Sequence, residues 1–159
     1  MISSFPALAS KTSKILILGT MPGVKSLEKH EYYAHPQNAF WKIMFSLFSK
    51  LPVPPDFESR KKILIANDIA LWDVLESCER AGSLDSNIKN GIPNKIPELL
   101  ENHPNIKALI FNGKESHKIF VKTFGSSISL PQIVMPSTSP ANTMKFDMKL
   151  ENWKTILNF

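Results

Sequence analysis

Cysteine is almost absent from this chain of 159 residues, which contains a single one, Cys78. One thiol cannot close an internal disulfide, and it cannot hold an iron–sulfur cluster, which needs several thiolate ligands. Four histidines are present without the spacing of a metal site such as HExxH; they are His30, His35, His103 and His117. The sequence therefore predicts no metal and no cofactor, and Cys78 is expected to be a small buried side chain.

Long apolar runs are also missing. No run approaches the roughly 20 apolar residues that a membrane-spanning helix needs. The N-terminal segment MISSFPALASKTSK lacks a basic stretch followed by a long apolar one, so no signal peptide is predicted. The glycine-rich motifs GxGxxG and GxxxxGK are absent, which disfavours a small nucleotide-handling α/β protein. We therefore expect a cytoplasmic protein with no membrane partner.

What is present is an ordinary globular composition with an excess of basic residues. Hydrophobic residues make up 43% of the chain, and its length suits one domain over residues 1–159, which we expect to be a monomer. The formal net charge of +5 is compatible with a polyanionic partner such as DNA. The positive charges are dispersed along the sequence, so a binding face has to be assembled by folding.

Hydrophobic patterning predicts that strands alternate with helices. Strands are expected at 14–19, 69–73, 106–111 and 130–135, and helices at 37–51, 58–67, 95–102, 114–124 and 147–158. Residues 1–13 are expected to be a polar lead-in, and residues 74–93 a loop with one helical turn. Asn94 is a candidate N-cap, and Gly125 is placed as a C-cap. The alternation indicates a parallel sheet with helices on both faces.

The most informative stretch runs from Ile15 to Trp41. Its first residues, ILIL, form a continuous apolar run, as expected of a strand covered on both faces, and this run ends at Gly19. Pro22 and Gly23 then predict a tight turn. A loop rich in aromatic and amide side chains follows and leads into a helix that begins near Gln37. This loop is therefore expected at the carboxyl end of a central strand, where open α/β sheets bind ligands.

Three segments of the chain resemble one known family. GTMPG followed by YYAHPQNAFW is similar to the first motif of the uracil-DNA glycosylase superfamily. MPSTSPANT (Met135 to Thr143) is similar to the second motif of its hypoxanthine (deoxyinosine) DNA glycosylase branch, and IALWDVLESCERAGSLDSNI (Ile69 to Ile88) also resembles that branch. The resemblance covers most of the chain in order. It implies a three-layer α/β/α fold with a central four-stranded parallel sheet.

Two residues are candidates for holding a base that has been flipped out of the double helix. In the resembling motif, an aromatic residue just before the AHP segment stacks on the base, which indicates Tyr33; the alternative is a core aromatic. Asn112 ends the apolar run 106–111 and is expected at the same edge of the sheet. Its amide can meet N1–H and O6 of hypoxanthine, and equally N3–H and O4 of uracil. Its alternative role is a turn or cap residue before Gly113.

Asn38 is the candidate for positioning the attacking water. Several branches of the superfamily place Asp or Asn where this chain has Met21, whose thioether cannot orient or deprotonate a water. The hypoxanthine branch relies instead on the Asn of a PxN segment, which is Asn38 here. An amide is not a general base near pH 7, so it can only position water, and we expect a largely dissociative reaction. Alternatively, Asn38 caps the 37–51 helix.

The loop after the first strand is expected to form the pocket wall through its backbone. The residues assigned to this role are Gly19, Thr20, Met21 and Pro22. Three carboxylates are available as substitutes for a missing general base, although each is more often structural than catalytic. They are Asp68, Asp73 and Asp85.

The second motif supplies hydroxyl and backbone N–H groups. Relatives in other branches carry His or Asn in this loop, where the chain has Ser137, Thr138 and Ser139. These groups are expected to bind phosphate or to support the leaving base, with Ser137 assigned to the substrate and Ser139 and Asn142 to DNA. The alternative is a Ser- and Pro-rich loop without a binding role.

The sequence thus predicts a monofunctional DNA glycosylase that excises deaminated bases, hypoxanthine first. No lysine stands at a recognisable Schiff-base position, so strand cleavage is not expected. The nearest rival is a uracil-specific or mismatch-specific glycosylase. A catalytically silent nucleic-acid-binding module of the same fold is the other rival, and Met21 is the feature that favours it.

Overall fold

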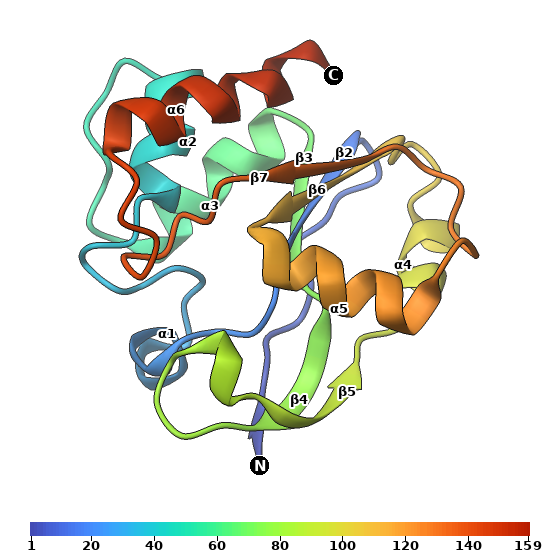
Figure 1. Cartoon of the computed structure of the whole chain (residues 1–159). Coiled ribbons are helices and arrows are strands. Elements are labelled where there is room, and N and C mark those ends of the chain that lie inside the picture. The colour runs from blue at the N-terminus through green and yellow to red at the C-terminus, as the bar shows by residue number, and fades with distance from the viewer.

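A parallel sheet of four strands forms the centre of the protein (Figure 1). The computed structural model describes residues 1–159 and orders the strands β3-β2-β6-β7. All neighbouring strands in this sheet are parallel. The strands are β2 (Ile15–Gly19), β3 (Ile69–Asp73), β6 (Ala108–Asn112) and β7 (Gln132–Met135). Each agrees with the predicted strand to within two residues.

Helices cover both faces of this sheet. They are α2 (Phe40–Phe48), α3 (Phe57–Ala66), α4 (Ile96–Asn102), α5 (Lys114–Phe124) and α6 (Phe146–Trp153). Ile15 and Ile17 of β2 pack with buried residues of α2, α3 and α6, whereas Leu16 and Leu18 pack with those of α4 and α5. Figure 1 shows the same two groups of helices on either side of the sheet. The three-layer α/β/α fold is therefore confirmed.

A second, smaller sheet lies beside the amino-terminal segment. It is antiparallel, with the order β1-β4-β5, and its strands are β1 (Ile2–Ser3), β4 (Leu75–Glu79) and β5 (Lys89–Pro93). The prediction of a loop over 74–93 was wrong for β4 and β5, but residues 80–88 between them form a loop with one turn of 3-10 helix, η1 (Asp85–Asn87), as predicted. Residues 1–13 are more than a lead-in, because Ile2 pairs with Cys78. Pairing between segments so distant in sequence leaves no local pattern, and Gly91 and Pro93 disfavour a strand.

Helix boundaries also differ from the prediction. A short helix, α1 (Val24–Lys29), was not predicted, and the last predicted helix ends at Trp153 and continues as a 3-10 helix, η2 (Lys154–Asn158). Gly125 is confirmed as the C-cap residue of α5. Asn94 is not an N-cap; its Nδ2 donates to the backbone carbonyls of Asp73 and Leu75 at 2.8 and 3.1 Å. No helix in the chain has the length and apolar character needed to cross a membrane.

Candidate active site

The parallel strands end at one edge of the sheet, and the segments that follow them surround a cavity of about 880 Å³. The last residues of the strands line this cavity, namely Gly19, Asp73, Asn112 and Met135. Residues that are far apart in the sequence therefore converge here, as expected at the carboxyl edge of a parallel sheet.

Every residue that the sequence analysis assigned to the site lines the cavity: Gly19, Thr20, Met21, Pro22, Tyr33, Asn38, Asn112, Ser137, Ser139 and Asn142. Of the three available carboxylates, Asp73 and Asp85 also line it. Asp68 precedes β3, and so it lies at the opposite edge of the sheet. No group of three or more His, Cys, Asp or Glu side chains gathers anywhere in the chain, which leaves no cluster of metal ligands.

Tyr33 is fixed in the cavity wall by an uncommon backbone conformation. Its φ of +54° lies in the left-handed region, which costs a bulky residue on the order of 1 kcal/mol and is frequent at functional sites. Its ring stacks on Phe40, with 4.2 Å between the ring centroids. A base can therefore stack only on the opposite face. Tyr32 is instead a core residue, 3% exposed, whose hydroxyl donates to the Pro6 carbonyl at 2.8 Å.

Gly19 is a glycine because two polar groups occupy the space beside it. A Cβ on Gly19 would lie 2.6 Å from Asp73 Oδ1 and 2.8 Å from Tyr33 Oη, closer than side chains tolerate. Gly113 combines a φ of +99° with a similar close approach, because its Cβ would lie 3.0 Å from that of Ser137. These two glycines allow the ends of β2 and β6 to pack directly against the groups that line the cavity.

The Asn112 side chain is held in one orientation by Thr138. Its Oδ1 accepts from the Thr138 backbone N–H at 2.9 Å, and its Nδ2 donates to Thr138 Oγ1 at 3.0 Å. Because a backbone N–H can only donate, it fixes which end of the amide is oxygen. One N–H and one acceptor lone pair of the amide remain for a ligand. The residue is buried, and its amide therefore presents a fixed donor and a fixed acceptor to the cavity.

Thr138 also connects the two motifs. Its carbonyl accepts from the backbone N–H of Ala39, immediately before α2, at 3.0 Å. Bonds within the loop also hold the second motif: Ser137 Oγ accepts from the Ser139 N–H at 3.2 Å, and Asn142 Nδ2 donates to the Ser137 carbonyl at 3.0 Å. From α6, Trp153 Nε1 donates to the Pro136 carbonyl at 2.9 Å and Lys149 Nζ donates to the Ser139 carbonyl at 3.2 Å. Thr138 was named in the sequence analysis only as a member of the loop. Its role in joining β6, α2 and this loop has no signature in the sequence.

Asn38 stands at the start of α2. Its Oδ1 accepts from the Phe40 backbone N–H at 2.9 Å, which satisfies one of the free donors at the helix end. The N-cap position itself is held by Ala39, so Asn38 supports the helix start from one residue further out. This role does not exclude the positioning of water, because the same oxygen has a second lone pair and the side chain lines the cavity.

Asp73 differs from the other two available carboxylates in its surroundings. It is 3% exposed, and its Oδ2 has no hydrogen-bond partner. Burial raises its pKa to about 7. The nearby negative charge of Asp85 adds to this effect, and the positive charge of Arg80 opposes it. The sequence did contain a signal, since Asp73 ends a buried strand in the same way as Asn112.

We expect Asp73→Asn to stabilise the protein in neutral solution. A carboxyl with a raised pKa keeps its proton in the folded state while the unfolded chain loses it, so wild-type stability falls as the pH rises from about 4 to about 7. The advantage of the variant should grow by up to about 1.4 kcal/mol per pH unit in this window and level off above it. Urea denaturation of both proteins across pH 4 to 8 measures this difference, and a constant difference would show that Asp73 ionises normally.

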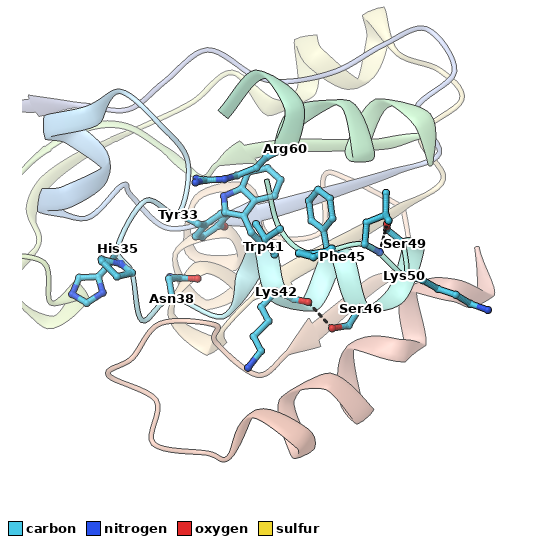
Figure 2. A pocket seen from close by; sticks show the side chains of 14 residues that line it. Tyr33, His35, Asn38, Trp41, Lys42, Phe45, Ser46, Ser49, Lys50 and Arg60 are labelled. Atoms are coloured by element: carbon cyan, nitrogen blue, oxygen red, sulfur yellow. Dashed lines mark hydrogen bonds between the residues drawn. The ribbon is translucent and has the colours of Figure 1, made fainter. Parts of the chain in front are cut away.

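A second cavity, of about 550 Å³, lies against α2 (Figure 2). It shares Tyr33, His35 and Asn38 with the first cavity, so the two are adjacent. Its charged lining residues are all basic, namely Lys42, Lys50 and Arg60, in addition to His35. The larger cavity is not basic, because its two lysines stand beside the carboxyl groups of Asp73, Asp85 and Glu115. The best candidate for a basic binding face assembled by folding therefore lies beside the larger cavity rather than inside it.

A cavity lined by Tyr33 and the fixed Asn112 amide, at the carboxyl edge of a three-layer α/β/α fold, is where proteins of this class bind small ligands. Residues 5–158 match the family described as "Uracil DNA glycosylase superfamily". The chain belongs to this superfamily.

Known relatives cover nearly the whole chain. A hypoxanthine DNA glycosylase from Methanosarcina barkeri is 32% identical over 94% of this chain and 93% of its own length. A hypoxanthine DNA glycosylase from Methanosarcina acetivorans is 31% identical over 96% of this chain and 95% of its own. The solution NMR structure of a candidate uracil DNA glycosylase from M. acetivorans superposes with a TM-score of 0.81, at 30% identity over 97% of this chain and 94% of that one.

Proposed function

We propose that the protein is a monofunctional DNA glycosylase that flips deaminated bases out of DNA and hydrolyses their N-glycosidic bonds, with hypoxanthine as the main substrate. The observation that carries this proposal is the convergence of both motifs on one cavity. The chain in which they converge is 31–32% identical, over nearly its full length, to two hypoxanthine DNA glycosylases. Base excision repair is the process in which such an activity acts.

We assign the flipped base to the larger cavity. Tyr33 stacks on the base with the ring face that Phe40 leaves free, a contact typically worth about 1–3 kcal/mol. The remaining N–H and lone pair of Asn112 recognise the O6 and N1–H groups of hypoxanthine. Backbone groups from Gly19 to Pro22 and the Ser137 hydroxyl complete the wall, while Ser139 and Asn142 approach the DNA.

The chemistry is dissociative in this proposal. The bond between C1′ and N9 breaks first, and the sugar develops oxocarbenium character. A water held by the Asn38 carbonyl oxygen then captures C1′. Met21 is 7% exposed in the cavity wall and offers no group that orients water, which leaves Asn38 as the nearest amide in the first motif.

The direct test compares lesions. Purified protein is incubated with duplex oligonucleotides that carry inosine, uracil or xanthosine, and abasic sites are then cleaved with alkali. The proposal predicts product from the inosine duplex at the highest rate. Preference for uracil would support the rival uracil-specific enzyme, because the Asn112 amide matches both bases. Tight DNA binding without product from any lesion would support a silent binding module.

We expect Asn112→Ala to lower the excision of hypoxanthine while leaving non-specific DNA affinity nearly unchanged. The loss of a buried bidentate contact should cost roughly 1–3 kcal/mol, or about 5-fold to 150-fold in rate. The matched control is Thr138→Val, which removes the Oγ1 acceptor of Asn112 but keeps the backbone N–H that orients it. If both variants lose activity in parallel with thermal stability, Asn112 is a structural residue.

We expect DNA affinity to fall steeply as salt rises, because bound phosphates release counterions. Lys42 and Lys50 line the second cavity and are the candidate phosphate contacts. Changing both to Gln should reduce the slope of log K against log salt by about 1–2. The control is the same change at the exposed residues Lys11 and Lys122, which line neither cavity. Equal slopes for the two double variants would contradict a phosphate track on this face.

A further inference from the structure

Three buried side-chain atoms in the whole chain lack a hydrogen-bond partner: Tyr33 Oη, Asp73 Oδ2 and Arg80 Nη1. Such atoms are rare in folded proteins, and each one costs about 1–3 kcal/mol unless something completes it. Tyr33 and Asp73 both line the larger cavity, and both flank Gly19. Their placement at one point of the wall indicates that a polar ligand completes them.

The Asp73 carboxyl is positioned rigidly. Its residue ends β3, and its backbone carbonyl accepts from Asn94 Nδ2 at 2.8 Å. The missing side chain of Gly19 leaves room for Oδ1, which lies 2.6 Å from the point that a Cβ would occupy. The side chain is directed into the site by packing and not by a partner, because no lysine or arginine forms an ion pair with it.

The groups around Asp73 disfavour its ionised form. Asp85, on η1, adds a negative charge, and the hydroxyls of Tyr32 and Tyr33, from the loop before α2, carry no charge to offset it. Arg80 is the one nearby cation, but its Nη2 donates to the Pro22 carbonyl and its Nε donates to the Gly82 carbonyl at 2.8 Å. Together with burial, these surroundings raise the pKa of Asp73 to about 7.

Resting on the proposed glycosylase activity, we infer that Asp73 acts as a neutral carboxylic acid that donates a hydrogen bond to the 6-oxopurine base as it leaves the sugar. When the bond between C1′ and N9 breaks, its electron pair stays on the base, which becomes negatively charged. Hypoxanthine has acceptors at O6, N3 and N7 over which this charge spreads. A donor in a buried site stabilises that charge far more than water does. Water then forms the new bond to C1′, and the proton that it releases neutralises the base.

The remainder of the cavity supplies no better donor for this task. Asn38 contributes an acceptor to water in the proposed mechanism, and the one Asn112 N–H that does not bond to Thr138 is already assigned to O6 of the base. The second motif contributes the Ser137 hydroxyl to the cavity and no ionisable ring or ammonium group. Lys25, His35 and Lys114 also line the cavity, but none of them flanks Gly19 as Asp73 and Tyr33 do. A neutral Asp73 therefore provides the charge stabilisation that an amide at Asn38 cannot.

The test is the pH dependence of single-turnover excision from an inosine duplex, for wild type, Asp73→Asn and Asp73→Ala. Wild-type rate should be constant in mildly acidic solution and fall about tenfold per pH unit once Asp73 ionises. Asp73→Asn keeps a donor that cannot ionise, so it should stay within about tenfold of the wild-type plateau and lack this fall. Asp73→Ala should react about a hundredfold more slowly than the wild-type plateau at every pH, a typical cost of losing one such donor. The hypoxanthine base can itself ionise, but this affects the pH profiles of all three proteins equally and cannot cause a difference between them.

Two controls separate this inference from the proposed function and from misfolding. Asp68→Asn, at the opposite edge of the sheet, should keep the wild-type rate and profile, and melting curves confirm that each variant is folded. If wild type releases no base, the proposed function fails. If wild type is active and Asp73→Asn shows the same alkaline fall, or Asp73→Ala retains the wild-type rate, the role of Asp73 is wrong. Loss of activity in both folded Asp73 variants would equally overturn a hydrogen-bond role.

Discussion

Replacement of Asn38 by alanine should lower the single-turnover rate of base excision by about tenfold to a thousandfold, which corresponds to about 1.4–4 kcal/mol of transition-state stabilisation. The side chain lines the cavity, and its carbonyl oxygen keeps one lone pair after bonding to the Phe40 N–H at 2.9 Å. Removal of that oxygen leaves the attacking water without a fixed position. Rapid-quench kinetics with enzyme in excess measures the chemical step.

Asn38→Asp separates the two roles of this residue. A carboxylate still accepts from the Phe40 N–H, so the helix end is preserved, and it can also hold water. The rate should therefore recover in part relative to Asn38→Ala and gain a new pH dependence. If Asn38 only caps α2, alanine should cost about 1 kcal/mol of stability and neither change should affect the chemical step. In that case Asp73 or Asp85 becomes the candidate for the water.

Met21→Asn is a complementary test of the proposal that Asn38 positions the attacking water. Met21 lies in the cavity wall at the position where other branches carry Asp or Asn. An amide there should add a second group that orients water and raise the excision of uracil. An active wild-type enzyme in which neither Asn38 nor position 21 affects the chemical step would contradict the proposed placement of the water.

Phe40→Ala should reduce the free energy of unfolding by about 3–5 kcal/mol, the usual cost of removing a fully buried aromatic ring. Phe40 is completely buried and contacts three other aromatic rings: it stacks on Tyr33 at 4.2 Å and meets Trp41 and Trp153 edge to face at 5.0 and 6.4 Å. It therefore connects the core of the α2 and α6 layer to the wall of the site. Urea denaturation at neutral pH measures the loss.

The same substitution should also weaken base binding, because Tyr33 loses the ring behind it. Phe40→Leu is the control, since it keeps most of the apolar volume but removes the stack. We expect it to retain most of the stability and to lose substrate affinity. If Phe40→Leu binds substrate as well as wild type, the support of Tyr33 by Phe40 is unimportant for stacking.

The central sheet was predictable because its strands are buried on both faces. A short, continuous apolar run such as Ile15–Leu18 is typical of a strand that helices cover on both sides, and Gly19 and Gly113 mark where two of the strands end. The sequence therefore predicted the strands, and with them the position of the site residues at the carboxyl ends of those strands. The resemblance supplied the roles, but the sheet edge alone predicted that Asn112 and the GTMPG loop are neighbours.

The second sheet and the polar interactions were not predictable, for physical reasons. β1 has two residues and depends on pairing with Ser77 and Cys78, which no local pattern can indicate. Asn94 has the position of a helix cap but bonds to the carbonyls of Asp73 and Leu75, because the end of β3 and the start of β4 lie next to it. The burial of Asp73 likewise depends on how β3 packs against loops that are distant in sequence.

The most direct measurement of the central claim is the release of free base. An inosine-containing duplex is incubated with the protein and the small-molecule fraction is analysed by mass spectrometry, while the strand is followed before and after alkali. The account predicts one free hypoxanthine for each lesion and a strand that remains intact until alkali cleaves it. Strand cleavage without free hypoxanthine, or no reaction in the presence of bound DNA, would contradict it.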